Sequence, residues 1–171
     1  MVLALDSSGE EVLRLPGYGI TGNIAYISNG MVVNENTPLV LYTGYEDGAS
    51  DDSDYASAQM GIYSLKDRKW IVEPARQSVT LFSDSVYMIG SDVGNLYRID
   101  GTCIEEGAEN VTVQGNFIIS RRAVYDKTGQ LLIMIQENEN VWTVLYDEIL
   151  INQHFPDGIH YTKCVNAKGE T

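Results

Sequence analysis

Residues 96–104 read LYRIDGTCI, an apolar run, an Asp-Gly turn and a second apolar run. The same phrase returns at 3–13 as LALDSSGEEVL and at 124–132 as VYDKTGQLL, and looser copies stand at 62–71 and 163–169. Asp or Asn followed by Gly between apolar runs predicts a tight hairpin, because these residues accept positive φ and cap their own backbone. Repetition of the unit predicts a repeat protein built from hairpins.

A second phrase lies half a unit away and consists of an apolar run, a short polar turn and another apolar run. It occurs at 27–33, 82–88, 113–119 and 146–151. The last three copies stand roughly 30 residues apart, which is short for a repeat of several strands. Two hairpins per unit predict a four-stranded antiparallel meander, the building block of a β-propeller blade, although sandwiches and solenoids also use such sheets.

Helix signals are nearly absent from the sequence. No window repeats apolar residues at a period near 3.6, and Val, Ile, Tyr and Thr fill the apolar runs. We therefore predict a single all-β, β-propeller-like domain with units at about 24–74, 79–107 and 111–136 and partial units at 1–15 and 141–171. One alternative is that the N-terminal hairpin closes the propeller ring. We expect instead that the chain is a piece of a longer protein, whose open sheet edges pair with a second copy or with the missing repeats.

Composition limits the partners. The chain has 24 Asp and Glu residues against 11 Lys and Arg, a net charge of −13, which disfavours nucleic acid because phosphate binding requires a basic face. No apolar run approaches the roughly 20 residues of a membrane span, and residues 1–15 lack a signal-peptide pattern. The compartment stays open, with a cell-surface or extracellular location possible for part of a longer chain. Cys103 and Cys164 are predicted to be buried free thiols.

Two loops carry ligand-like motifs without the required context. Residues 17–22, GYGITG, have the spacing of a dinucleotide loop, but a strand pattern follows instead of the helix that would bind the phosphates. Residues 44–55 form an acidic insertion whose carboxylates, such as Asp47 and Asp51, are suitable Ca²⁺ ligands, but their order does not match an EF-hand. We expect a solvated loop and no cofactor, with calcium at the acidic loop as the alternative.

His154 and His160 are the only histidines and flank a turn at 155–159. Together with Asp147 they are a candidate His-His-Asp metal site, since imidazole and carboxylate groups suit zinc or iron. Residues six apart across a turn need not face the same side of a sheet. We therefore expect two exposed histidines and no metal site.

Tyrosines recur in the predicted strands near their turns, where the ring packs and the hydroxyl reaches solvent. Repeated rings along one rim can contact a protein, a peptide or a glycan. The candidate binding residues are Tyr63, Tyr97 and Tyr125, with the neighbouring Asp100 and Asp126. Packing within the sheets is the alternative role for these rings.

An enzyme is the alternative function. The sequence contains no Gly-x-Ser-x-Gly elbow, and no catalytic residue is predicted. A propeller-fold glycan hydrolase or lyase would need carboxylates such as Asp84, Asp100 and Asp126 to converge in one cleft with raised pKa values. Scattered, solvated carboxylates would favour a binding module.

Residues 61–74, GIYSLKDRKWIVEP, resemble the bacterial WG-repeat pattern, in which a G-L-Y-D-x-x-G-K-W-V-I-x-P hairpin precedes an apolar hairpin like that at 81–88. Residues 123–133, AVYDKTGQLLI, are a weaker copy, Arg68 stands at the turn glycine of the pattern, and no copy has the Trp-Gly pair. The resemblance implies a divergent, propeller-like bacterial repeat protein. Proteins of that kind are mostly thought to mediate interactions, so it implies a non-enzymatic module that binds a protein, peptide or glycan.

Overall fold

A computed structural model of the 171-residue chain describes residues 2–5, 8, 10–15, 39–44, 59–64, 66–166, 168 and 170. All regular elements in these residues are β-strands in antiparallel sheets, which confirms the all-β prediction. None of the described residues forms a helix long and apolar enough to cross a membrane. The glycine-rich motif at 17–22, the hairpin predicted at 27–33 and the acidic insertion after Gly44 lie outside the described residues.

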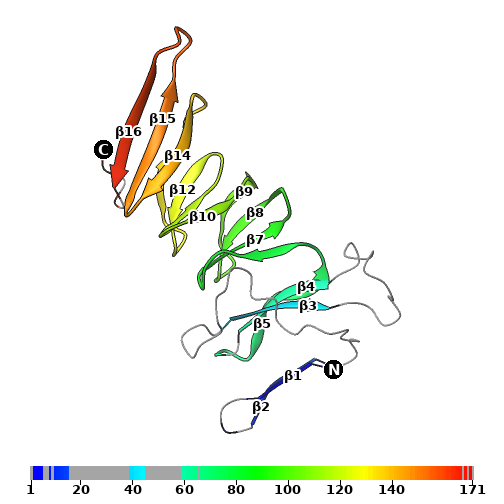
Figure 1. Ribbon diagram of the computed structural model, residues 1–171. Coiled ribbons are helices and arrows are strands. Elements are labelled where there is room, and N and C mark those ends of the chain that lie inside the picture. Colours follow the sequence, from blue (N-terminus) through cyan, green and yellow to red (C-terminus); the bar gives the residue numbers. More distant parts are fainter. Residues whose placement is uncertain are drawn as a thin grey trace. The chain divides into compact units, whose positions relative to one another are not determined.

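The chain divides into two compact units, one of residues 1–84 and 89–91 and the other of 85–88 and 92–171. In the first unit, β1 (Val2–Leu5) pairs with β2 (Glu11–Leu15), and a three-stranded sheet contains β3 (Leu39–Gly44), β4 (Gln59–Ser64) and β5 (Lys69–Arg76) (Figure 1). The pairing of β4 with β5 shifts register on both sides of Ile62. Gly61 suits this irregular pairing, because a Cβ atom there would stand 2.6 Å from the Val72 carbonyl oxygen.

Three further sheets follow in the order of the sequence. The first contains β6 (Val79–Leu81), β7 (Val86–Gly90), β8 (Val93–Arg98) and β9 (Cys103–Glu109). The second contains β10 (Thr112–Gln114), β11 (Phe117–Ile119), β12 (Ala123–Asp126) and β13 (Leu131–Met134). The third contains β14 (Glu139–Leu145), β15 (Glu148–His154) and β16 (His160–Asn166). The first two are four-stranded antiparallel sheets of the predicted kind.

One backbone hydrogen bond recurs in these three sheets. An N–H group near the end of the second strand donates to a carbonyl that lies shortly before the first strand. The three bonds run from Gly90 to Ser78, from Arg121 to Glu109 and from His154 to Asn138, at 2.9, 3.0 and 2.8 Å. The repeat therefore extends from the sequence to the hydrogen bonds.

The turn after the third strand of each sheet also recurs. The N–H groups of Arg98, Asp126 and Asn166 each donate to the carbonyl four residues further on, at 2.9, 3.0 and 2.9 Å. Asp126 and Asn166 also use a side-chain oxygen in the same way, since each Oδ1 accepts from the backbone N–H groups two and four residues on. The looser copy of the phrase near the C-terminus thus forms the same turn as the copy at 124–132.

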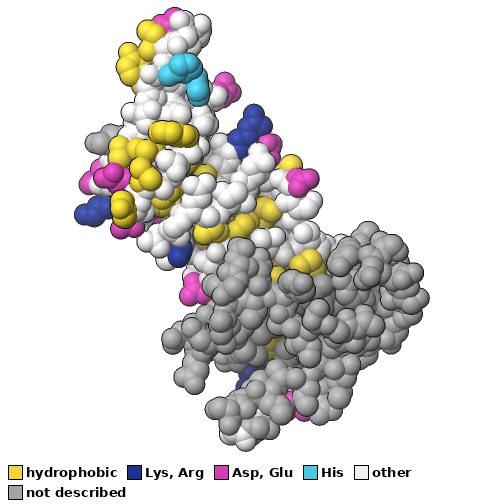
Figure 2. Space-filling model, in the orientation of Figure 1, with side chains coloured by type: hydrophobic (Ala, Val, Ile, Leu, Met, Phe, Trp, Pro, Cys, Tyr) yellow, Lys and Arg dark blue, Asp and Glu magenta, His cyan; other side chains and the backbone are white. Residues whose placement is uncertain are grey.

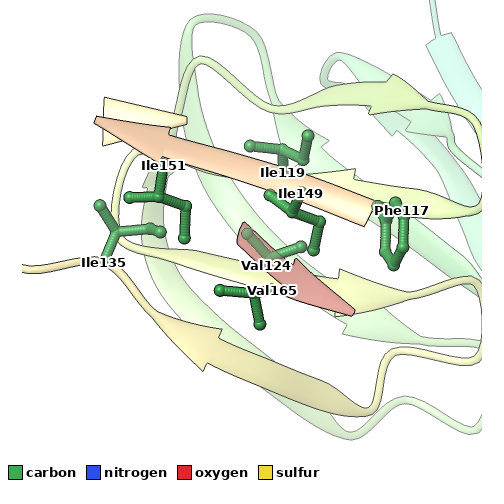
Figure 3. Packing of buried hydrophobic residues seen from close by; sticks show 7 residues of the cluster. All are labelled: Phe117, Ile119, Val124, Ile135, Ile149, Ile151 and Val165. Carbon is green, nitrogen blue, oxygen red and sulfur yellow. The ribbon is translucent and has the colours of Figure 1, made fainter. Parts of the chain in front are cut away.

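An apolar core lies between the sheet β10–β13 and the sheet β14–β16 (Figure 3). Its members are at most 9% exposed and are Phe117, Ile119, Val124, Ile135, Ile149, Ile151 and Val165. The central strands β11 and β15 supply four of these seven side chains. Their continuous apolar runs fit strands that have neighbours on both edges and a packed sheet against one face.

An ion pair lies on the core-facing side of the last sheet. Lys163 Nζ donates to Glu139 Oε1 at 2.7 Å, and the N–H of Gln136 donates to Glu139 Oε2 at 3.1 Å. Desolvation raises the pKa of the Glu139 carboxyl, but these two hydrogen bonds outweigh it and hold the pKa below its ordinary value of 4.5. The pair therefore contributes more stability when Glu139 is charged.

Glu139→Gln is expected to reduce the loss of stability on acidification. A carboxyl whose pKa is lower in the folded chain stabilises the fold above its unfolded pKa, and this contribution is lost as the pH falls through the folded pKa. Urea unfolding at pH 7 and pH 3 should show a pH-dependent loss that is smaller in the variant by on the order of 1 kcal/mol. Glu137→Gln, at an exposed neighbouring site, is the control, and equal losses in both variants would contradict the prediction.

Candidate binding surface

Tyr125 lies in a buried polar network. The residue is 4% exposed, and its hydroxyl donates to Glu105 Oε2 at 3.0 Å. Ser120 Oγ donates to the same carboxylate oxygen at 2.7 Å, and Arg122 Nε donates to Glu105 Oε1 at 3.2 Å. Burial, with the adjacent charge of Glu105 and the hydrogen bond to it, raises the pKa of the Tyr125 hydroxyl, which therefore remains a protonated donor.

Arg122 connects this network to the backbone of β9. Its Nη2 donates to the carbonyl oxygens of Glu106 and Gly107. An open pocket of about 570 Å³ lies alongside, and Glu105, Arg122 and Tyr125 are among the residues that line it. Because Arg122 and Tyr125 both already bind Glu105, we assign the network to holding β9 against the start of β12. Tyr125 thus has the packing role that was the alternative for it.

The other two candidate tyrosines pack against neighbouring rings. Tyr97 stacks on Tyr87 with ring centroids 5.4 Å apart and planes 17° from parallel. Tyr63 in the first unit is 9% exposed and contacts Trp70 edge to face, with centroids 5.2 Å apart. These contacts account for both rings as packing groups of their own sheets.

Asp100 and Asp126 hold hairpin turns. Asp100 Oδ1 accepts the Thr102 N–H at 2.9 Å, and this hydrogen bond lowers the pKa of the carboxyl. At Asp126 desolvation raises the pKa, but hydrogen bonds from Thr128 and Gln130 outweigh it and lower the pKa. A glycosidase general acid needs a raised pKa, which neither carboxyl has. Asp84, the third carboxylate considered, belongs to the first unit.

The sheet β14–β16 has a second face, opposite the core. Strand alternation and register place eleven side chains there, and we call this set the outer face: Asn140, Thr143, Leu145, Glu148, Leu150, Asn152, His154, His160, Thr162, Cys164 and Asn166. Side chains on it bond across the strands. Thr162 Oγ1 donates to Asn152 Oδ1 at 2.8 Å, and Cys164 Sγ donates to Glu148 Oε2 at 3.3 Å.

The prediction of buried thiols is wrong for both cysteines, which are free and exposed. Cys164 falls on the outer face because its neighbour Val165 occupies the core-facing position. The hydrogen bond to Glu148 raises the pKa of the Cys164 thiol. Cys103 is the first residue of β9, where the strand leaves a hairpin turn.

Large apolar side chains are exposed around the last sheet. Trp142, which the β14–β15 register skips at a bulge, is 62% exposed, and Tyr146 in the following turn is 97% exposed. Near the other turn, Phe155 and Tyr161 are 37% and 60% exposed and contact each other edge to face. Figure 2 shows hydrophobic side chains over this sheet on both sides of the two histidines.

We define the aromatic surface as six exposed residues in two groups, Trp142, Leu145 and Tyr146 toward the β14–β15 turn and Phe155, Ile159 and Tyr161 at the β15–β16 turn. Phe155 and Tyr161 contact each other, and exposed apolar side chains in contact mark interaction sites more often than single ones do. None of the six is among the candidate binding residues predicted from the sequence, although Tyr146 and Tyr161 belong to the tyrosines that recur near the predicted turns. The available signal was the run 141–145, Val-Trp-Thr-Val-Leu, in which paired apolar residues break the alternation of a regular strand and indicate a bulge.

His154 and His160 are exposed, as expected, and are directly opposite each other in the β15–β16 register, so both lie on the outer face. Partners across an antiparallel pair share a face whatever the length of the turn. Their Nδ1 atoms are 2.7 Å apart, and His154 Nε2 is 2.8 Å from Asn140 Oδ1. Asp147 lies beyond the other end of β15 and accepts a hydrogen bond from Asn116 at 3.1 Å, so it does not join the two histidines in the candidate His-His-Asp site.

No group of three or more His, Cys, Asp or Glu side chains that could hold a metal ion occurs within the part of the chain that the structure describes. No family model matches the chain, and neither a curated protein nor a solved structure matches it. Roles for the residues above therefore depend on their own geometry and chemistry.

Proposed function

We propose that this chain is a non-enzymatic, propeller-like repeat module that binds a protein or peptide through the aromatic surface of its last sheet. The observation that carries the proposal is the exposure of Trp142, Tyr146 and Tyr161, each at 60% or more. Trp and Tyr are enriched in protein interfaces and supply many of the residues that dominate binding energy. Burying these rings against a partner would remove a large apolar area from water.

Two observations support a propeller-like repeat of the WG type. The backbone hydrogen bonds before the first strand and after the third strand recur from sheet to sheet. Arg68, which stands at the turn glycine of the WG pattern, adopts a φ of 52°, in the left-handed region that glycine supplies most easily. Arg68 therefore has the backbone conformation that a turn glycine would supply at this position.

Charge near the aromatic surface favours a particular kind of partner. Asp147 and Asp157 lie in the two turns that carry its rings, and Glu148 starts β15. Of the nearby cations, Lys163 is paired with Glu139 on the core-facing side, and Lys168 is exposed just after β16. Carboxylates beside exposed aromatic rings complement a segment with apolar side chains flanked by Lys or Arg. A neutral glycan would stack on the rings but would gain little from the carboxylates.

The carboxylates do not favour the alternative of a glycan hydrolase or lyase. Side-chain oxygens of Asp100 and Asp126 accept hydrogen bonds from backbone N–H groups in their turns, and the pKa of each carboxyl is lowered. A retaining or inverting glycosidase needs one carboxyl that stays protonated near neutral pH. We therefore prefer the binding module.

Trp142→Ala and Tyr161→Ala are each expected to weaken peptide binding about thirty-fold, the loss typical of a residue that dominates an interface. Ligands would be selected from a random peptide display library with the full chain, and enrichment of apolar segments flanked by Lys or Arg is expected. Affinities would be measured by isothermal titration calorimetry. Val93→Ala, at an exposed apolar site outside the last sheet, is the matched control and should leave affinity unchanged.

Two results would contradict the proposal. Equal affinities in the parent, the two aromatic variants and the control would show that binding lies elsewhere. Binding of neutral oligosaccharides on a glycan array, with no peptide selected, would make the partner a glycan. Circular dichroism of each variant would confirm that the sheets are retained.

A further inference from the structure

We propose that His154 and His160 form a two-histidine binding site for a divalent transition metal such as Ni²⁺, Cu²⁺ or Zn²⁺. His154 ends β15 and His160 begins β16, and the two are cross-strand partners on the outer face. Both residues are exposed, so a hydrated ion can reach them. Neutral imidazole nitrogen is a favoured ligand of these three metals.

The spacing of the two nitrogens is close to that of a chelating pair. The Nδ1 atoms are 2.7 Å apart, with ring planes at 79°. Metal–nitrogen bonds of about 2.0–2.1 Å place two ligands about 2.9 Å apart at a right angle and about 3.3 Å apart in a tetrahedron. The rings thus need to separate by only a few tenths of an ångström, which side-chain rotation at the end of a hairpin can supply.

Asn140 orients one of the two rings. His154 Nε2 lies 2.8 Å from Asn140 Oδ1, an oxygen that can only accept, so Nε2 carries the proton and the neutral ring keeps its lone pair at Nδ1. Metal-binding histidines usually donate their other N–H to such an acceptor. The neighbouring Asn138 Nδ2 donates to the His154 carbonyl at 3.1 Å and holds the backbone at this position.

The hydrogen bond between the rings is compatible with metal binding. Without metal, the Nδ1–H of His160 donates to the free Nδ1 of His154. Binding requires lone pairs on both Nδ1 atoms, so His160 must carry its proton on Nε2 instead. Among the described residues, no third His, Cys, Asp or Glu side chain groups with this pair, so water would occupy the remaining coordination positions. We infer an open site of moderate affinity.

The test is calorimetric titration of the full chain with Ni²⁺, produced without a polyhistidine tag. Cys103→Ser and Cys164→Ser form the background, because exposed thiols also bind such metals. One ion per chain is expected, and His154→Ala or His160→Ala should each lower the association constant at least about ten-fold. Asn140→Ala keeps both ligands and should lower it about ten-fold, as loss of a ligand's hydrogen-bond partner does.

Asn152→Ala, on the same outer face, is the matched control and should leave metal binding unchanged. A second measurement does not depend on any substituted chain folding, since Zn²⁺ should shift the ¹⁵Nδ1 resonances of both histidines in the parent protein. Absence of these shifts, or Ni²⁺ binding that persists in both histidine variants, would overturn the proposal. The pair would then serve only as a hydrogen bond across the hairpin end.

Discussion

Phe117→Ala is expected to lower the free energy of unfolding by about 3–5 kcal/mol. Phe117 is 1% exposed and belongs to the core between the sheets β10–β13 and β14–β16. Figure 3 shows its ring beside Ile149, which comes from the opposite sheet. Removing the ring loses the free energy gained by burying it and leaves a cavity that the two antiparallel sheets can fill only partly.

Urea unfolding followed by far-ultraviolet circular dichroism measures this loss. Trp142 fluorescence in a Trp70→Phe background would follow the second unit separately, since the chain has two compact units and two tryptophans. Leu131→Ala, at a site 47% exposed in β13, is the control and should change stability by less than about 0.5 kcal/mol. A loss below about 1 kcal/mol for Phe117→Ala would argue against the packing of the two sheets.

Glu105→Ala is expected to lower the free energy of unfolding by about 3 kcal/mol. Glu105 is 9% exposed and accepts hydrogen bonds from Ser120, Arg122 and Tyr125. Removing the Glu105 carboxylate leaves the Tyr125 hydroxyl buried without its closest acceptor. The more exposed Arg122 side chain can form hydrogen bonds to water instead. The cost therefore comes mainly from the buried hydroxyl and the lost charge-assisted hydrogen bonds.

A double-mutant cycle tests that explanation. Tyr125→Phe in the Glu105→Ala background should cost less than in the parent, because the hydroxyl has already lost its acceptor. Glu106→Ala is the matched control, since its backbone carbonyl rather than its side chain accepts from Arg122. Additive losses from the two substitutions, or an equal loss in the control, would show that the network does not hold the fold.

The candidate site was less predictable from sequence than the sheets were. Asp100 and Asp126 were considered as binding residues, yet the turn chemistry that identified the hairpins also engages both carboxylates. Tyr125 was selected as a rim residue, but whether a tyrosine is exposed depends on the sheet packed over it. Trp142 escaped selection because its exposure follows from a bulge that shifts the register within β14.

Local interactions explain what the sequence alone determined. Apolar runs interrupted by Asp, Asn and Gly determined the strands, their antiparallel hairpins and the repeat of four-stranded sheets, since turn preferences and strand alternation act over a few residues. Only the tertiary structure paired Glu105 with Tyr125, 20 residues apart, and set His154 opposite His160. The first contact depends on the packing of distant segments, and the second depends on the register between β15 and β16, which the alternation within each strand does not specify.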